Sequence, residues 1–170
     1  MAHRKKSSLA TALKQKRPFV SLEQEAYLSI LRTASELSYA VEQFFRPFDI
    51  TPSQYNVLRI LRGAGAEGLC RNEISERMVT ATPDMSRLLD RMERAGWVTR
   101  ERAEGDRRQV STYITKPGME LLEVLESPIR DFLAQLFERS AVSDLKTIVK
   151  VNDQIRAHLN QTVLGREQPR

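Results

Sequence analysis

One change of hydrophobic period constrains the fold of this chain more than any other feature. In TPDMSRLLDRMERAG, residues 82–96, the apolar residues recur at spacings of three and four, which is typical of an amphipathic helix. Directly afterwards the period becomes two, in VTRER (98–102) and VSTYI (110–114), with Gly105 between the two runs. That pattern predicts a β-hairpin. A helix followed at once by a hairpin leaves few folds open to the chain.

The ends of segment 82–96 carry helix-capping signals. Thr82 is expected at the N-cap, Pro83 at the first helical position and Asp84 at the second, where a negative charge complements the helix dipole. Gly96 is expected to end the helix, because glycine readily adopts the left-handed conformation found after a helix C-terminus.

The same apolar spacing predicts further helices on both sides of this segment. They cover residues 21–49, 52–65, 70–79, about 118–137 and about 143–159. Pro128 should kink or break its helix near Ser127, because a proline removes a backbone hydrogen bond at a cost of about 3 kcal/mol. The predicted fold class is therefore mainly α with a small β-hairpin.

Length, hydropathy and charge narrow the class of protein. A chain of 170 residues suits one domain, alone or completed by a partner chain. No apolar run approaches the roughly 20 residues that span a bilayer, and the N-terminus has no secretory signal, so we expect a cytoplasmic protein. The net charge is +5, and residues 1–20 hold six basic residues and no acid. This arm suits non-specific contact with a polyanion, although a disordered, solubilising tail is at least an equal alternative.

Residue patterns for catalysis or metal binding are missing from the sequence. Cys70 is the only cysteine, and His3 and His158 are far apart, so we expect no intrachain disulfide and no metal site. There is no glycine-rich phosphate loop, GxSxG or HExxH motif. We therefore expect no enzyme activity and no cofactor.

The order of elements over residues 50–116 is helix, short helix, capped helix and hairpin, which is a helix-turn-helix followed by a wing. The capped helix is the one expected to enter the major groove of DNA. Its apolar residues form one stripe. On the opposite face, short side chains lie near the N-terminal end of the helix and arginines lie towards its C-terminal end. The residues predicted to contact DNA from this helix are Thr82, Pro83, Asp84, Ser86, Arg87, Arg91 and Arg94.

The basic residues of the helix-turn-helix and wing are arginines rather than lysines. Residues 71–108 contain nine arginines and no lysine, and the planar fork of arginine matches guanine edges and phosphate oxygens. The segment also contains eight acids, so for any single arginine an ion pair within the fold is as good an explanation as a contact with DNA. Arg87 is the best candidate for contact with a base or a phosphate.

The succession ITPSQYNVLRIL, EISERM, TPDMSRLLDRMERAGWVTR and GDRRQVSTYIT followed by KPG resembles the MarR family of bacterial transcriptional regulators. The motifs cover residues 50–118, and the helix order extends over 21–160. The resemblance implies a homodimer with interlocked terminal helices, whose recognition helices enter successive major grooves while the wings reach the flanking minor grooves. By matching position, Arg107 or Arg108 would contact the minor groove from the wing tip, and Asp106 would stabilise the wing by an ion pair.

The resemblance also implies a function and its regulation. In this family aromatic acids or other anionic phenolics often bind between the dimerisation helices and the winged lobe and weaken DNA binding. Candidate lining residues are Tyr27, Tyr39, Tyr55 and Trp97, although aromatic residues at helical spacing are more often part of a core. We expect a homodimeric repressor of a pseudo-palindromic operator, relieved by a small aromatic or anionic effector. The alternative is an architectural DNA-binding protein without sequence preference.

The apolar stripes predict the dimer independently. Those on residues 21–48, 118–137 and 143–159 exceed what a winged domain of about 65 residues can cover, whereas a second copy related by a two-fold axis would bury them. Two-fold symmetry then predicts operator half-sites about 10 bp apart.

Cys70 departs from the family pattern, which usually has a hydroxyl residue at this helix cap. Together with Glu73 it forms a C-x-x-E version of the capping box. One hypothesis is an oxidant-sensing thiol, activated by the helix N-terminus and by Arg71. The alternative is a small residue that is merely tolerated at a cap.

These inferences divide the chain into five regions. They are a basic arm (1–20), a dimerisation helix (21–49), a winged helix-turn-helix (50–116), C-terminal dimerisation helices (117–160) and a tail (161–170).

Overall fold

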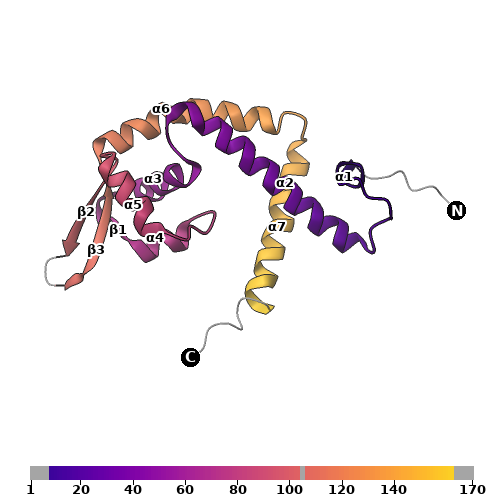
Figure 1. Cartoon of the computed structure of the whole chain (residues 1–170), viewed down its shortest axis with the longest axis horizontal. Coiled ribbons are helices and arrows are strands. Elements are labelled where there is room, and N and C mark those ends of the chain that lie inside the picture. The colour runs from indigo at the N-terminus through magenta and orange to yellow at the C-terminus, as the bar shows by residue number, and fades with distance from the viewer. Residues whose placement is uncertain (1–7, 104–105, 163–170) are drawn as a thin grey trace. The chain divides into compact units, whose positions relative to one another are not determined.

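The computed structural model describes residues 8–103 and 106–162, and side chains at 9–102 and 110–162. In chain order the elements are α1 (Ser8–Ala12), α2 (Leu22–Phe45), the 3-10 turn η1 (Arg46–Phe48), α3 (Pro52–Ala64), the 3-10 turn η2 (Gly65–Glu67), β1 (Leu69–Cys70), α4 (Arg71–Arg77), α5 (Met85–Arg94), β2 (Val98–Ala103), β3 (Asp106–Ile114), α6 (Lys116–Leu136) and α7 (Val142–Thr162) (Figure 1). The mainly helical fold with a small antiparallel sheet is the one that the sequence predicts.

The chain divides into two compact units, Met1–Glu123 and Val124–Arg170, and the boundary falls within α6. The first unit contains the elements of the predicted winged helix-turn-helix, and α7 lies in the second. The short helix α1 falls inside the predicted basic arm.

Side-chain caps fix where the first long helices begin. The Ser21 hydroxyl accepts the N–H of Gln24 at 3.2 Å, and α2 starts at the next residue. The Thr51 hydroxyl accepts the N–H of Gln54, and the Gln54 side chain accepts the N–H of Thr51 at 2.8 Å, so this capping box starts α3 at Pro52. Both starts agree with the predicted ones, because a hydroxyl at the N-cap satisfies a backbone donor that the helix leaves free.

The core of the first unit collects the apolar faces of α3, α4, α5 and β2. These faces contribute Val57, Leu58, Leu61, Ile74, Leu88, Leu89, Met92 and Val98, each at most 4% exposed. Phe45 at the end of α2 is also buried, and its ring lies 4.9 Å from that of Tyr55. The helical spacing in the sequence therefore marked core positions in this region.

The sheet has three strands in the order β1, β3, β2, all antiparallel. The hairpin β2–β3 was predicted, and the structure pairs Val98 with Ile114 and Arg100 with Thr112. Strand β1 was not, because Leu69 and Cys70 form a pairing of two residues that is too short to show a period. They lie opposite Thr112 and Ser111 of β3, so the sheet connects the hairpin to the start of α4.

Two glycines allow close packing around the hairpin. A Cβ atom at Gly68, whose φ is +61°, would lie 2.5 Å from the ring of Tyr113. A Cβ at Gly118, in the first turn of α6, would lie 2.3 Å from the carbonyl oxygen of Trp97. Real side chains essentially never come so close, so only glycine fits either position without rearrangement.

Helix α6 runs without interruption through Pro128, so the break predicted near Ser127 does not occur. Proline lacks an N–H, so the carbonyl of Val124 loses its usual helix donor. The helix continues on both sides of Pro128, so its other backbone hydrogen bonds can still form. The alternative, a kink at this proline, stays a prediction. Helix α7 covers Val142–Thr162, slightly beyond the predicted 143–159.

Large apolar side chains are exposed along α2 and α7. On α2 they are Leu22, Tyr27, Ile30, Leu31 and Tyr39, and on α7 they are Val142, Ile148, Val149, Val151, Ile155 and Leu159. Every one is at least 40% exposed.

Within the described residues, no helix is both long enough and apolar enough to cross a membrane.

Candidate nucleic-acid interface

Helix α5 presents one face to the core and the opposite face to solvent. Met85, Leu88, Leu89 and Met92 are buried at 5% exposure or less, as predicted. On the other face Pro83, Asp84, Ser86, Arg87, Arg91 and Arg94 are exposed, and Thr82 is half-buried. The structure therefore brings the helix residues predicted to contact DNA onto one surface.

The start of α5 differs from the prediction. The N-cap is Asp84, whose carboxylate accepts the N–H of Arg87 at 3.0 Å, and the helix begins at Met85. Thr82 instead directs its hydroxyl to the carbonyl of Thr80 at 3.4 Å, and Pro83 precedes the helix. Threonine and aspartate are both good N-caps, and the carboxylate, lying two residues nearer the apolar stripe, caps the helix here. The cap also holds Arg87, since the Arg87 Nε lies 3.0 Å from Asp84 Oδ2.

This cap predicts unequal effects for two alanine substitutions. Asp84→Ala should lower the free energy of unfolding by about 1 kcal/mol, because it leaves the Arg87 N–H without its acceptor. Thr82→Ala should leave stability nearly unchanged. Urea unfolding followed by circular dichroism measures both, and a larger loss for Thr82→Ala would restore the N-cap that the sequence suggested.

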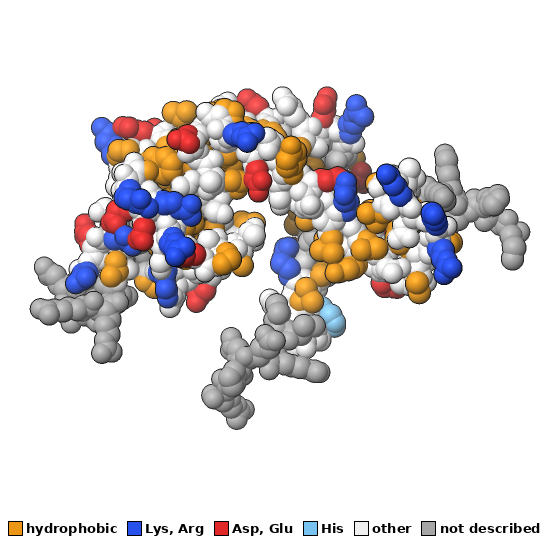
Figure 2. Space-filling model, in the orientation of Figure 1, with side chains coloured by type: hydrophobic (Ala, Val, Ile, Leu, Met, Phe, Trp, Pro, Cys, Tyr) orange, Lys and Arg blue, Asp and Glu red, His pale blue; other side chains and the backbone are white. Residues whose placement is uncertain are grey.

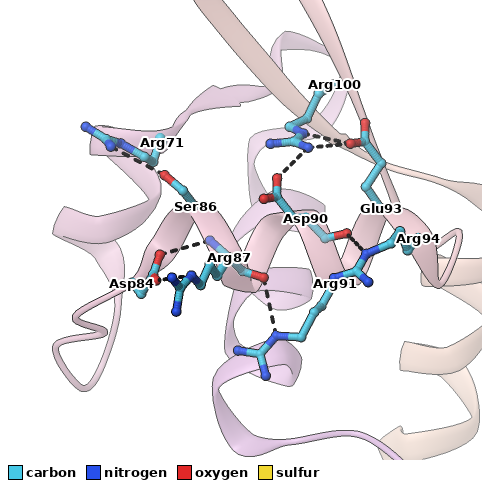
Figure 3. Close-up of polar contacts among 9 residues, drawn as sticks. All are labelled: Arg71, Asp84, Ser86, Arg87, Asp90, Arg91, Glu93, Arg94 and Arg100. Carbon is cyan, nitrogen blue, oxygen red and sulfur yellow. Dashed lines mark hydrogen bonds and ion pairs between the residues drawn. The ribbon is translucent and has the colours of Figure 1, made fainter.

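Arg100 of β2 binds two acids of α5. Its Nε and Nη2 donate to Glu93 Oε2 at 2.9 and 2.5 Å, and its Nη2 lies 2.7 Å from Asp90 Oδ1 (Figure 3). The hydrogen bond to Glu93 raises the pKa of the guanidinium above its ordinary value. Arg100 is placed for this contact because alternation along β2 puts it on the same face as buried Val98. Sequence spacing alone does not reveal this contact, because it depends on how β2 packs against α5.

The other arginines of α5 bond differently. Arg91 Nε donates to the carbonyl of Arg87, and Arg94 Nε donates to the carbonyl of Asp90, both at 3.3 Å (Figure 3). Among the side chains that the structure describes, neither has an acidic partner. Within the described part of the chain, Arg87 pairs only with the exposed carboxylate of Asp84, and its own side chain is 83% exposed.

Helix α4 adds an arginine that was not predicted. Arg71, at the start of α4, directs Nη1 toward the Ser86 hydroxyl at 3.5 Å and donates from Nη2 to Asn72 Oδ1 at 3.1 Å. Its side chain is exposed, and Figure 3 shows it beside the N-terminal turn of α5.

The turn between α4 and α5 is held by Asn56 of α3, whose Oδ1 accepts the N–H of Val79 at 2.9 Å. Such a contact between distant segments leaves no local signal in the sequence.

Three predicted wing residues lie outside the described side chains. Asp106, Arg107 and Arg108 belong to β3 by their backbone, but the minor-groove contact of the arginines and the stabilising ion pair of Asp106 stay predictions. Over the lobe of α3–α5 and the hairpin, Figure 2 shows basic side chains gathered with acidic ones among them.

Cys70 is half-buried at the N-cap of α4, where the Glu73 carboxylate accepts its N–H at 2.8 Å. This hydrogen bond from the Cys70 backbone lowers the pKa of Glu73. The predicted contact between Glu73 and the cap therefore forms, whereas an oxidant-sensing role of the thiol stays a prediction. No cluster of three or more potential metal ligands occurs among the described residues.

The tyrosines suggested as effector contacts are in different environments. Tyr55 is half-buried, and its ring packs on that of Phe45. Tyr27 and Tyr39 are at least 60% exposed on α2, and Trp97 is half-buried in the turn before β2.

Comparisons with known proteins agree with this geometry. The model of the MarR family matches residues 48–109, which include α3, α4, α5 and β2. A MarR transcription factor from Planctomyces limnophilus is 34% identical over 81% of this chain and 99% of its own, with a TM-score of 0.63. The S. aureus MepR structure, solved as a complex with DNA, is 25% identical over 82% of this chain and 97% of its own, with a TM-score of 0.62. The HTH-type transcriptional regulator PecS of Dickeya dadantii is 28% identical over 138 residues, 78% of this chain and 83% of PecS.

Proposed function

Because the chain belongs to the MarR family of transcriptional regulators, we propose that it is a homodimeric repressor that binds a pseudo-palindromic operator and is released by a small aromatic or anionic ligand. Its relatives are regulators of transcription rather than enzymes, in agreement with the sequence. As a regulator of transcription it works in the cytoplasm, where a bacterial chromosome lies.

The observation that carries the proposal is the exposed face of α5. It presents Arg87, Arg91 and Arg94 beside a β-hairpin, and the guanidinium groups of the last two face no acid among the described side chains. Arginines in this arrangement suit phosphate oxygens on both edges of a groove, while the short side chains near the helix N-terminus suit close approach to base edges. The DNA complex of MepR, a relative with the same fold, supports this assignment.

The exposed apolar stripe of α7 supports the dimer. Ile148 and Ile155 are seven residues apart on this helix and are 51% and 40% exposed. Apolar side chains in such a row are costly in water and are usually covered by another surface. A second copy of the chain, related by a two-fold axis, would cover this stripe and the one on α2.

Charge placed on this stripe should separate the two copies. Ile148→Lys combined with Ile155→Lys is expected to give a folded monomer, since both side chains are exposed in the single chain and tolerate a polar replacement. Size-exclusion chromatography with light scattering measures the mass. The matched control is Gln154→Lys with Gln161→Lys, which adds the same charges at the same spacing on exposed polar positions of α7 and should stay dimeric. A double isoleucine variant with the mass of a dimer would contradict the proposed interface.

Selection of bound fragments from the organism's own genomic DNA tests sequence preference. A regulator should enrich a two-fold consensus and bind it more than about 10³ times more tightly than unrelated duplex at physiological salt. An architectural protein, the second candidate, should bind both with similar affinity. It keeps some support from the basic residues of the N-terminal arm, which suit contact with phosphates of any sequence.

Relief by a ligand requires a difference in affinity. The effector must bind the conformation that cannot bind DNA more tightly than the one that can, because otherwise the equilibrium between them does not shift. Repeating the genomic selection with aromatic acids and other anionic phenolics tests this. If fragments are retained at every ligand concentration, regulation by this chemical class is excluded.

A further inference from the structure

Helix α5 carries acids between its exposed arginines, which opposes binding to a polyanion. Asp90 precedes Arg94 by four residues, the spacing and orientation that favour an ion pair on a helix surface. Glu93 lies directly before Arg94 and two residues after Arg91. On the helix alone, these two carboxylates would reduce the positive charge of the face on which Arg91 and Arg94 lie.

The expected pair within the helix is absent from the structure. Asp90 and Glu93 both direct their carboxylates to Arg100 of β2, at 2.7 and 2.5 Å from its Nη2. Arg94 meets Asp90 only through the backbone carbonyl, at 3.3 Å from its Nε. The planar fork of one arginine thus occupies both acids at once, which a point charge would do less well.

Arg100 is better placed for this contact than the arginines of α5. Its side chain is 28% exposed, and the carboxylates face it from the helix that packs on β2. Ion pairs that are partly shielded from water are screened less by salt than exposed ones. Arg91 and Arg94 remain on the exposed face with their terminal nitrogens free of acidic partners among the described side chains.

We propose that Arg100 is a positioning residue for DNA binding: it holds Asp90 and Glu93 against β2 so that Arg91 and Arg94 stay available for phosphates. This inference rests on the proposed function, because it assigns to Arg100 an effect on the affinity of the α5 face for DNA. Arg100 itself needs no contact with DNA.

Removal of Arg100 should therefore weaken DNA binding through the acids that it releases. In Arg100→Met, Asp90 is free to pair with Arg94, the released Glu93 carboxylate adds negative charge near the same face, and one or two phosphate contacts are lost. Each contact contributes about 0.9 to the slope of log K against log salt, or roughly 8-fold in affinity at 0.1 M salt relative to 1 M. The expected result is a slope shallower by about 1 to 2 and an affinity lower by about 8- to 60-fold at 0.1 M salt.

The decisive measurement repeats the substitution without the acids. In the Asp90→Asn, Glu93→Gln background, adding Arg100→Met should change neither the slope nor the affinity, because no carboxylate remains to capture Arg91 or Arg94. A purely structural role for Arg100, or a direct phosphate contact, predicts the same loss in both backgrounds. The probe is a fluorescently labelled duplex of mixed sequence, titrated by anisotropy at several salt concentrations.

Three further results make the test complete. Arg32→Met removes one arginine from an exposed pair on α2 and should leave the slope unchanged. Thermal melts show whether each variant is folded. If Arg100→Met alone unfolds, the acid-free background still decides, since a loss of affinity on adding Arg100→Met there overturns the inference. Wild type that fails to bind the duplex would refute DNA binding itself, whereas wild type that binds as tightly as Arg100→Met would refute only the role of Arg100.

Discussion

Replacing Arg87, Arg91 and Arg94 together by alanine is expected to weaken DNA binding by about 500-fold at 0.1 M salt while leaving the protein folded. Three phosphate contacts would account for about 2.7 of the slope of log K against log salt, and the factor of 500 is that slope taken over the tenfold range from 1 M to 0.1 M. Arg87 gives up an exposed pair with Asp84, which contributes little to stability. Alanine is also the best helix former, so α5 should keep its structure.

Anisotropy titrations with a duplex of mixed sequence measure this effect. The matched control removes three arginines from exposed ion pairs on α2, α6 and α7, namely Arg32, Arg130 and Arg156, each replaced by alanine. It lowers the net charge by the same amount, so any effect of overall charge appears in both variants. Equal salt slopes for the two variants would show that the face of α5 does not meet DNA.

The core of the lobe could be predicted from the sequence because it depends on local spacing. Met85, Leu88, Leu89 and Met92 recur at helical intervals, and all four are buried. The hairpin followed from a period of two, and the helices α2 and α3 followed from apolar residues at helical spacing. Each of these signals lies within about a dozen residues of the element that it specifies.

Competition between nearby groups made other features harder to predict. Thr82, Pro83 and Asp84 all favour a helix start, and the sequence does not say which side chain reaches a free N–H first. The structure shows Asp84 bonded to Arg87. Nor does the helix sequence reveal that Asp90 prefers Arg100 to Arg94, because that choice depends on the packing of β2 against α5.

Contacts between distant segments had no local signal at all. The bond from Val79 to Asn56 and the pairing of β1 with β3 join residues more than twenty positions apart. The first joins the turn before α5 to α3, and the second joins the strand before α4 to the sheet. The sequence therefore indicated which face of α5 is exposed, whereas the groups that hold this face in place came only from the structure.

The largest expected loss of stability comes from adding a single methyl group at Gly118. Gly118→Ala places a Cβ atom 2.3 Å from the carbonyl oxygen of Trp97 and 2.9 Å from Ile114 Cγ1. The Trp97 carbonyl cannot move freely, because it accepts the N–H of Thr115 at 3.0 Å. Thr115 in turn donates its hydroxyl to the carbonyl of Gly96 at 2.6 Å, so the start of α6 is fixed on the turn between α5 and β2.

Gly118→Ala is therefore expected to lower the free energy of unfolding by about 1–3 kcal/mol, the usual cost of overpacking, even though alanine favours a helix. For a chain of this size that corresponds to a fall in Tm of roughly 2 to 12 °C. Gly63→Ala is the matched control. Gly63 also lies in a helix, and apart from its chain neighbours and its own helix backbone no described atom would lie within 4 Å of the new Cβ, so stability should rise by up to about 1 kcal/mol. Calorimetry on both variants measures the contrast. Equal or greater stability of Gly118→Ala would mean that the turn at Trp97 yields easily, and that α6 is not fixed to the DNA-binding lobe by this contact.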